Sequence, residues 1–133
     1  MSSVATANPV SKKMLWAGYV VSTLPVLMLI MSGVMKVMLP PDAEKGFGEL
    51  GWPMKYAIAL AVVELGSTLL YIIPQTAVLG AILLTGYLGG AIATHVRIGD
   101  VGSITIPVIL GVLIWLGLFL RDDRVRDLIP LRK

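Results

Sequence analysis

The stretch that decides the fold covers residues 56–73, YAIALAVVELGSTLLYII, and Glu64 is its only charged side chain. A helix needs about 20 predominantly apolar residues to cross a hydrocarbon core about 30 Å thick. The rest of the chain contains three more apolar runs without Lys, Arg, Asp or Glu, at residues 14–35, 76–94 and 101–120. The sequence therefore predicts four transmembrane helices.

The composition is typical of a membrane protein and excludes most soluble classes. Of the 133 residues, 56% are hydrophobic and 14% are charged, and the mean hydropathy is +0.86. An ordinary soluble domain is about 25% charged, and disordered or nucleic-acid-binding chains are more polar still. We predict an all-α, membrane-spanning four-helix bundle, formed by residues 1–133 as a single transmembrane domain, whose surroundings are the lipid bilayer and not nucleic acid.

Turn residues separate the predicted spans. Pro40 and Pro41 remove two backbone donors and stop the first helix. Pro74 and Gln75 are the whole connection between the second and third spans, which must then be antiparallel neighbours. Residues 46–53 are expected to form an extracytoplasmic loop. The predicted limits of the four spans and of the basic tail that follows them are residues 14–38, 54–73, 76–96, 103–120 and 121–133.

The positions of Lys and Arg predict the orientation. Lys12 and Lys13 precede the first span, and the tail at 121–133 holds five more Lys and Arg. Because Lys and Arg are enriched on the cytoplasmic side, both termini are predicted to be cytoplasmic in a multi-pass protein of the inner (cell) membrane. The run at 14–35 is too long for a signal peptide and has no small-x-small cleavage site after it, so we expect an uncleaved span. The start of the tail is expected to be an amphipathic turn at the headgroups.

The third span has the smallest side chains. Gly86 and Gly90 form a G-x-x-x-G motif that Thr94 extends. Small residues let membrane helices approach closely. The motif predicts helix packing within the chain, and the alternatives are a dimerisation face or the close approach of a flat ligand.

Glu64 is the most informative residue, because it lies about 12 Å below the start of its helix, near the middle of the bilayer. An ionised carboxylate at this depth is costly without a partner, so Glu64 should face the bundle interior. Ser67, Thr68 and Tyr71 follow at i+3, i+4 and i+7, on the same helix face. This polar face is either a ligand-binding or proton-exchange site, or a cluster that only fixes helix packing.

Lys36 and His95 end the first and third spans on the outer side. Lys36 is either a snorkelling lysine or part of a site, and His95 is either an interfacial residue or a ligand-binding residue. We predict a cavity lined by Glu64, Tyr71, His95 and Lys36. With one His and no Cys, the chain has neither bis-histidine haem ligands nor a thiolate cage, and no metal site is expected.

Five short segments stand out by their order and spacing: residues 32–36 (SGVMK), 49–53 (ELGWP), 63–65 (VEL), 72–74 (IIP) and 86–97 (GYLGGAIATHVR). Together they resemble the DoxX-like membrane proteins over about residues 14–129. The resemblance implies a bundle of four transmembrane helices with Lys36, Glu64 and His95 at polar positions typical of the family. It also implies a connection to quinones, because the family takes its name from a subunit of a thiosulfate:quinone oxidoreductase. The absence of Cys argues against persulfide chemistry on this chain's own side chains.

Two hypotheses for the function follow. In the first, the protein is a subunit of a membrane redox system, or a partner to one, and binds a quinone or a similar lipophilic ligand. Glu64 exchanges a proton with this ligand, and Lys36 assists electrostatically. Tyr71 and His95 donate hydrogen bonds to the ligand or accept them from it. In the second, it is a non-catalytic accessory or assembly subunit that packs against a larger membrane complex through the small residues of its third span, or forms a homo-oligomer. A small transporter is disfavoured, because four helices with one deep charge leave little machinery for alternating access.

Overall fold

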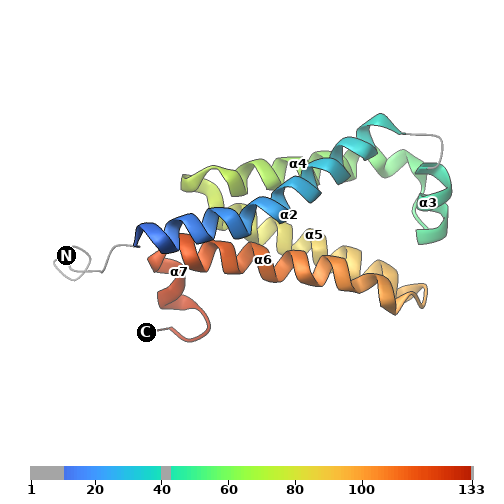
Figure 1. Ribbon diagram of the computed structural model, residues 1–133. Helices are drawn as coiled ribbons and strands as arrows, with labels where there is room; N and C mark the ends of the chain where they lie inside the picture. The colour runs from blue at the N-terminus through green and yellow to red at the C-terminus, as the bar shows by residue number, and fades with distance from the viewer. Residues whose placement is uncertain (1–10, 40–42, 133) are drawn as a thin grey trace.

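The computed structural model of the chain describes residues 11–39 and 43–132. Four long helices dominate it (Figure 1). A 3₁₀ turn directly precedes three of them, and when these turns are counted with their helices, all four are long and apolar enough to cross a membrane. The described part of the chain contains no strand, so the predicted all-α membrane bundle is confirmed. The long helices are α2 (Lys12–Met38), α4 (Ala57–Ile72), α5 (Ala77–Arg97) and α6 (Thr105–Arg121). The short elements are α3 (Ala43–Leu50), α7 (Asp123–Leu128) and the 3₁₀ turns η1 (Met54–Tyr56), η2 (Pro74–Thr76) and η3 (Val101–Ile104).

The four long helices form a ring around a common interior. Helix α2 packs against α4 and α6, and α5 packs against the same two helices, so α2 and α5 lie on opposite sides of the bundle. The turn η2 joins α4 directly to α5, which makes them the antiparallel neighbours that the short Pro74-Gln75 connection predicts. The start of α2 lies at the same end of the bundle as α7, which we call the terminal end, and α3 lies at the other, which we call the α3 end (Figure 1).

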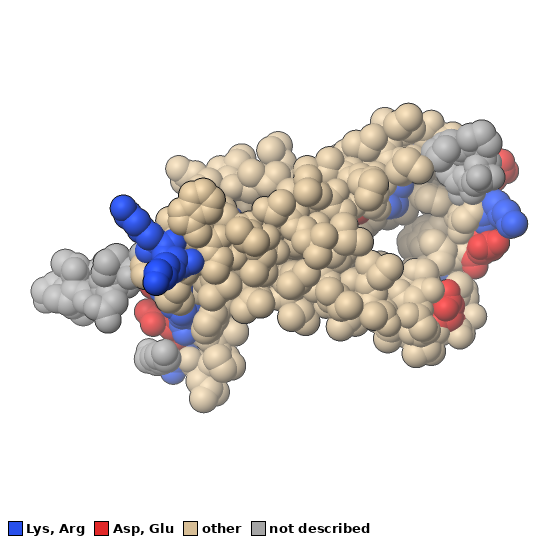
Figure 2. All heavy atoms as spheres, viewed as in Figure 1, with Lys and Arg blue, Asp and Glu red and all other residues tan. Residues whose placement is uncertain are grey.

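The outer surface of the bundle is apolar and its charges lie mainly at the two ends. Large apolar side chains such as Trp16, Val62 and Val112 are more than half exposed, as expected for helices that face lipid. Figure 2 shows Lys, Arg, Asp and Glu gathered at both ends of the molecule, with few between them. This distribution places the apolar middle of the bundle in the hydrocarbon core.

One segment differs from the expectations from sequence. Residues 46–50, the first part of the loop expected at 46–53, belong to helix α3 instead, where Phe47 and Leu50, one turn apart, are partly buried while Glu49 stays exposed. Helix α2 ends as expected, with Leu39 in the left-handed conformation at φ 49°. Pro40 and Pro41, on which that expected stop rests, lie outside the described residues.

Close helix contacts occur at glycines other than those of the G-x-x-x-G motif. A Cβ added to Gly80 would collide with the backbone of Tyr71, and a Cβ added to Gly117 would collide with the Ser22 hydroxyl. A Cβ on Gly86 or Gly90 would meet no atom of another segment within 4 Å. The close packing of α5 within the chain is therefore made at Gly80, about two to three turns from the motif, and Gly86 and Gly90 border open space.

Candidate functional site

Glu64 is a buried carboxylate with a cationic partner. Its side chain is 2% exposed, and Lys36 Nζ donates to its Oε1 over 3.0 Å. Lys36 reaches inward from the last turns of α2 and also donates to the Ser32 hydroxyl at 2.7 Å. The ion pair offsets part of the cost of holding a charge inside an apolar bundle. Lys36 is therefore not only a snorkelling lysine, because its ammonium group forms an ion pair with the Glu64 carboxylate inside the bundle.

Tyr87 on α5 is a third member of this group, and the cavity predicted from the sequence does not include it. Its hydroxyl donates to the same Glu64 Oε1 at 3.0 Å, and Lys36 Nζ lies 6.0 Å from the centre of its ring. A signal for it exists in the sequence, because Tyr87 precedes Gly90 by three residues and Thr94 by seven, which places all three on one helix face. We call Glu64, Lys36 and Tyr87 the carboxylate cluster.

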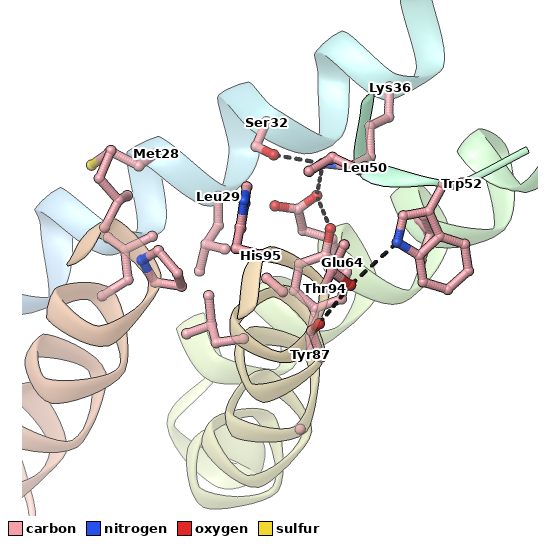
Figure 3. Close-up of a pocket in the computed structure, with 18 of the residues that line it drawn as sticks. Met28, Leu29, Ser32, Lys36, Leu50, Trp52, Glu64, Tyr87, Thr94 and His95 are labelled. Atoms are coloured by element: carbon pink, nitrogen blue, oxygen red, sulfur yellow. Dashed lines mark hydrogen bonds and ion pairs between the residues drawn. The ribbon is translucent and has the colours of Figure 1, made fainter. Parts of the chain in front are cut away.

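The two oxygens of Glu64 are not equivalent. Both hydrogen bonds from Lys36 and Tyr87 end on Oε1. Among the described residues, none donates a hydrogen bond to Oε2. Figure 3 shows the second oxygen turned away from Lys36, toward the side on which Leu29 and His95 lie. One acceptor atom of a buried carboxylate thus remains available to a ligand.

The carboxylate cluster forms one wall of a cavity of about 470 Å³ between the four long helices and α3. Figure 2 shows the molecule hollowed toward the α3 end. The volume lies within the range of about 300–1,000 Å³ that is usual for small-molecule sites. The lining is mostly apolar, with Gly86 and Gly90 among it. The polar lining residues are Ser32, Lys36, Glu64, Tyr87, Thr94 and His95.

The connection after α3 bounds the cavity at the α3 end of the bundle. Trp52 Nε1 donates to Thr94 Oγ1 at 3.3 Å (Figure 3). Arg97 Nη2 donates to the Leu50 carbonyl at 2.8 Å. These bonds attach the segment to the end of α5. Thr94, which we expected to extend a packing motif, instead holds the tryptophan that lines the cavity.

His95 also lines the cavity, as predicted, with its side chain 23% exposed. Its Nδ1 atom is buried without a hydrogen-bond partner in the described part of the chain, and Asp100 Oδ2 lies 3.7 Å from it. Within residues 11–39 and 43–132, no group of three His, Asp or Glu side chains is placed to hold a metal ion.

Tyr71 does not line the cavity, which corrects the prediction that placed it there. Its hydroxyl donates to the Ile114 carbonyl at 2.7 Å and shares a 3.0 Å hydrogen bond with Ser22, and the Arg121 guanidinium lies 4.8 Å from its ring centre. Seven residues of helix separate Tyr71 from Glu64 by about 10 Å. Tyr71 therefore belongs to a second polar cluster nearer the terminal end.

Ser67 and Thr68 are buried beside Glu64 on α4, but neither lines the cavity. The Thr68 hydroxyl donates to the Glu64 backbone carbonyl at 2.7 Å. The polar face expected on this helix exists as a buried face, and Glu64 is the member of it that reaches the cavity.

Comparison with known proteins adds the family. No curated protein and no solved structure matches the chain. The model of the DoxX-like family matches residues 20–117, a range that includes the whole carboxylate cluster and His95. Since this match covers most of the chain, the protein belongs to the DoxX-like family.

Proposed function

We propose that this protein binds a quinone or a similar lipophilic molecule in the cavity beside Glu64, as a subunit of a membrane redox system or a partner to one. The observation that carries the proposal is a carboxylate, 2% exposed, that borders a cavity of about 470 Å³ inside an apolar bundle. A buried charge next to an open cavity is expensive, and ionisable residues within membrane spans usually mark functional sites. Membership of the DoxX-like family supports the link to quinones.

The cavity suits a molecule that is mostly apolar and carries a few polar atoms. Most of its wall is aliphatic, aromatic or glycine, and its polar groups lie on α2, α4 and α5. In the proposed complex Glu64 exchanges a proton with the ligand, while Lys36 and Tyr87 hold the carboxylate in place. His95 hydrogen-bonds the ligand from the same cavity. Tyr71, which the first hypothesis placed against the ligand, has no part in this complex, and Tyr87 acts on the carboxylate and not on the ligand.

Two neighbouring glycines offer a matched test of this site. Gly90 lines the cavity, whereas Gly89 lines an outward groove between α5 and α6, and a Cβ on either would meet open space. Gly90→Leu should fill part of the cavity and lower the affinity for decylbenzoquinone and decylhydroquinone at least tenfold. Gly89→Leu should leave both affinities unchanged. Calorimetric titration of the purified full chain in mild detergent measures these affinities; no binding of either probe, or equal binding by both variants, would overturn the proposal.

The outward groove favours a second candidate function, that of an accessory or assembly subunit in a larger membrane complex. Thr85, Gly89, Gly111 and Trp115 line it, and small residues at such positions allow another helix to approach closely. In this case Gly89→Leu should abolish copurification of a partner protein in mild detergent, and Gly90→Leu should not. A solitary monomer in wild-type preparations argues against this function.

We place the protein in the cell (inner) membrane with both termini in the cytoplasm. The proposal rests on the basic residues near the terminal end, including Lys12, Lys13 and Arg121.

A further inference from the structure

We propose that the cavity selects a ligand that donates a hydrogen bond to Glu64 Oε2, namely a lipophilic phenol such as a hydroquinone, over the corresponding quinone. The inference rests on the proposed function and deepens it by naming the chemical class of the ligand. It follows from the hydrogen-bond geometry of one carboxylate.

Donors that belong to the protein already occupy one oxygen of this carboxylate. Lys36 Nζ and the Tyr87 hydroxyl both donate to Oε1, each at 3.0 Å. The tyrosine hydroxyl has a single proton, so this bond uses its donor capacity. As the anionic partner in the ion pair with Lys36, Glu64 presents Oε2 to the cavity as an acceptor.

The acceptor character of Oε2 sets what it will bind. A phenolic hydroxyl donates to it, and a hydrogen bond to a charged group is stronger than one between neutral groups. A quinone carbonyl brings lone pairs instead, which leaves Oε2 unpaired in an apolar wall and opposes it electrostatically. A hydrogen bond to a charged group corresponds to a difference of about ten- to a hundredfold in affinity.

Other polar groups of the cavity do not reverse this preference. Lys36 donates to both Ser32 and Glu64, which leaves one of its three protons for a ligand. His95 accepts or donates according to its tautomer, so it serves a hydroxyl and a carbonyl alike. Neither residue replaces an acceptor at the position of Oε2, which makes Glu64 the discriminating group.

Glu64→Gln should reverse the selectivity, because the two side chains have nearly the same shape. With Lys36 and Tyr87 both donating to one position, the amide oxygen will occupy the place of Oε1 and the amide NH₂ group the place of Oε2. The atom that faces the ligand then changes from an acceptor to a donor. This variant should bind a quinone carbonyl better than a phenolic hydroxyl.

The test compares three probes with the same tail: decylhydroquinone, its dimethyl ether, which lacks the donor, and decylbenzoquinone. Affinities are measured by calorimetric titration of the full chain in mild detergent without oxygen. Wild type should bind the hydroquinone at least about tenfold more tightly than the other two. Glu64→Gln should lose this preference or reverse it. Glu49→Gln, the same change at an exposed position on α3, should keep it.

The failure of this inference and the failure of the proposed function give different results. If the wild-type protein binds the hydroquinone no better than the quinone or the dimethyl ether, the proposed selectivity is wrong, but the proposed binding site is not affected. The same holds if the Glu64→Gln variant keeps the wild-type preference. Absence of binding for all three probes overturns the proposed function. The comparison in wild type needs no variant, so it decides the inference even if Glu64→Gln does not fold.

Discussion

Lys36 Nζ lies 3.0 Å from Glu64 Oε1, so an ion pair joins α2 to α4 inside the apolar part of the bundle across 28 residues of sequence. The two groups differ in exposure, because the lysine side chain is 19% exposed and the carboxylate 2%. The pair therefore lies at the boundary between the packed interior and the cavity. Its geometry leads to the first of five predictions.

Lys36→Met should destabilise the protein, because it leaves the Glu64 carboxylate buried without its cation. Removing one partner of a fully buried pair costs about 3–5 kcal/mol, and we expect a smaller loss here because Lys36 is 19% exposed. Thermal unfolding in detergent, followed by circular dichroism, measures the change. Adding Glu64→Gln to the same chain should recover most of the stability. If the double variant loses the sum of the two single losses instead, the groups do not interact.

The two buried tyrosines should separate stability from binding. Tyr71→Phe removes the hydroxyl that bonds to Ser22 and to the Ile114 carbonyl, and it should cost about 1–3 kcal/mol of folding free energy without changing ligand affinity. Tyr87→Phe removes a hydroxyl that bonds to Glu64 in the wall of the cavity, and it should change the affinity for decylhydroquinone. Unfolding and titration are measured on both variants. Equal effects on binding would contradict the separation of the two clusters.

Two glycines of α5 should respond in opposite ways to alanine. Gly80→Ala places a methyl group against the backbone of Tyr71, and overpacking of this kind costs about 1–3 kcal/mol. Gly90→Ala meets open space and gains up to about 1 kcal/mol from the better helix propensity of alanine. Thermal unfolding of both variants checks this. Destabilisation by Gly90→Ala would mean that the G-x-x-x-G motif packs after all.

Asp122 should make the stability of α7 depend on pH. It is the N-cap of α7, and it accepts from the Arg124 backbone N–H at 3.0 Å and from the Arg124 guanidinium at 3.1 Å. Burial raises the pKa of Asp122. The hydrogen bonds and the charge of Arg124 together lower this pKa by a larger amount, so that it lies below its ordinary value. The contribution of a carboxyl group with a lowered folded-state pKa is complete above its unfolded pKa of about 3.9 and is lost as the pH falls through the folded value.

The matching experiment compares wild type with Asp122→Ala across a pH series. At neutral pH the variant should be less stable by about 1 kcal/mol, the usual contribution of an N-cap. The difference should shrink as the pH falls through the lowered pKa of Asp122. A difference that stays constant down to acidic pH would show that the ionised carboxylate is not the stabilising group.

The orientation of the bundle can be tested on a background without native thiols, because the chain contains no Cys. Lys45→Cys is placed on α3 and Asp127→Cys on α7, both at exposed positions. A membrane-impermeant maleimide added to intact cells should label Lys45→Cys alone, and permeabilised cells should show labelling of both. The opposite pattern would place the termini outside the cytoplasm.

Much of the site was visible in the sequence as a set of residues, but not as an arrangement. Glu64, Lys36 and His95 stand out because each breaks or ends an apolar run, and all three line the cavity. The helix face that Tyr71 shares with Glu64 predicts that Tyr71 lines the cavity, yet two turns of helix place it in another cluster. Composition alone does not distinguish Tyr87, because an aromatic residue in an apolar span resembles its neighbours. Position along a helix axis decided between the two tyrosines.

Taken alone, the sequence determined that the protein is a bundle of four membrane-spanning helices with one deep carboxylate. It did so because the bilayer forces backbone groups to pair within each apolar segment, and span length and charge placement follow from local residues. The tertiary structure decided which side chains meet Glu64, which of its oxygens stays available, and that α3 and Trp52 bound the cavity. The reason is that a membrane helix is apolar on both its lipid-facing and its packed sides, so its periodicity does not reveal its rotation. Only the packing of α2, α4, α5 and α6 against one another fixes that rotation, and with it the site.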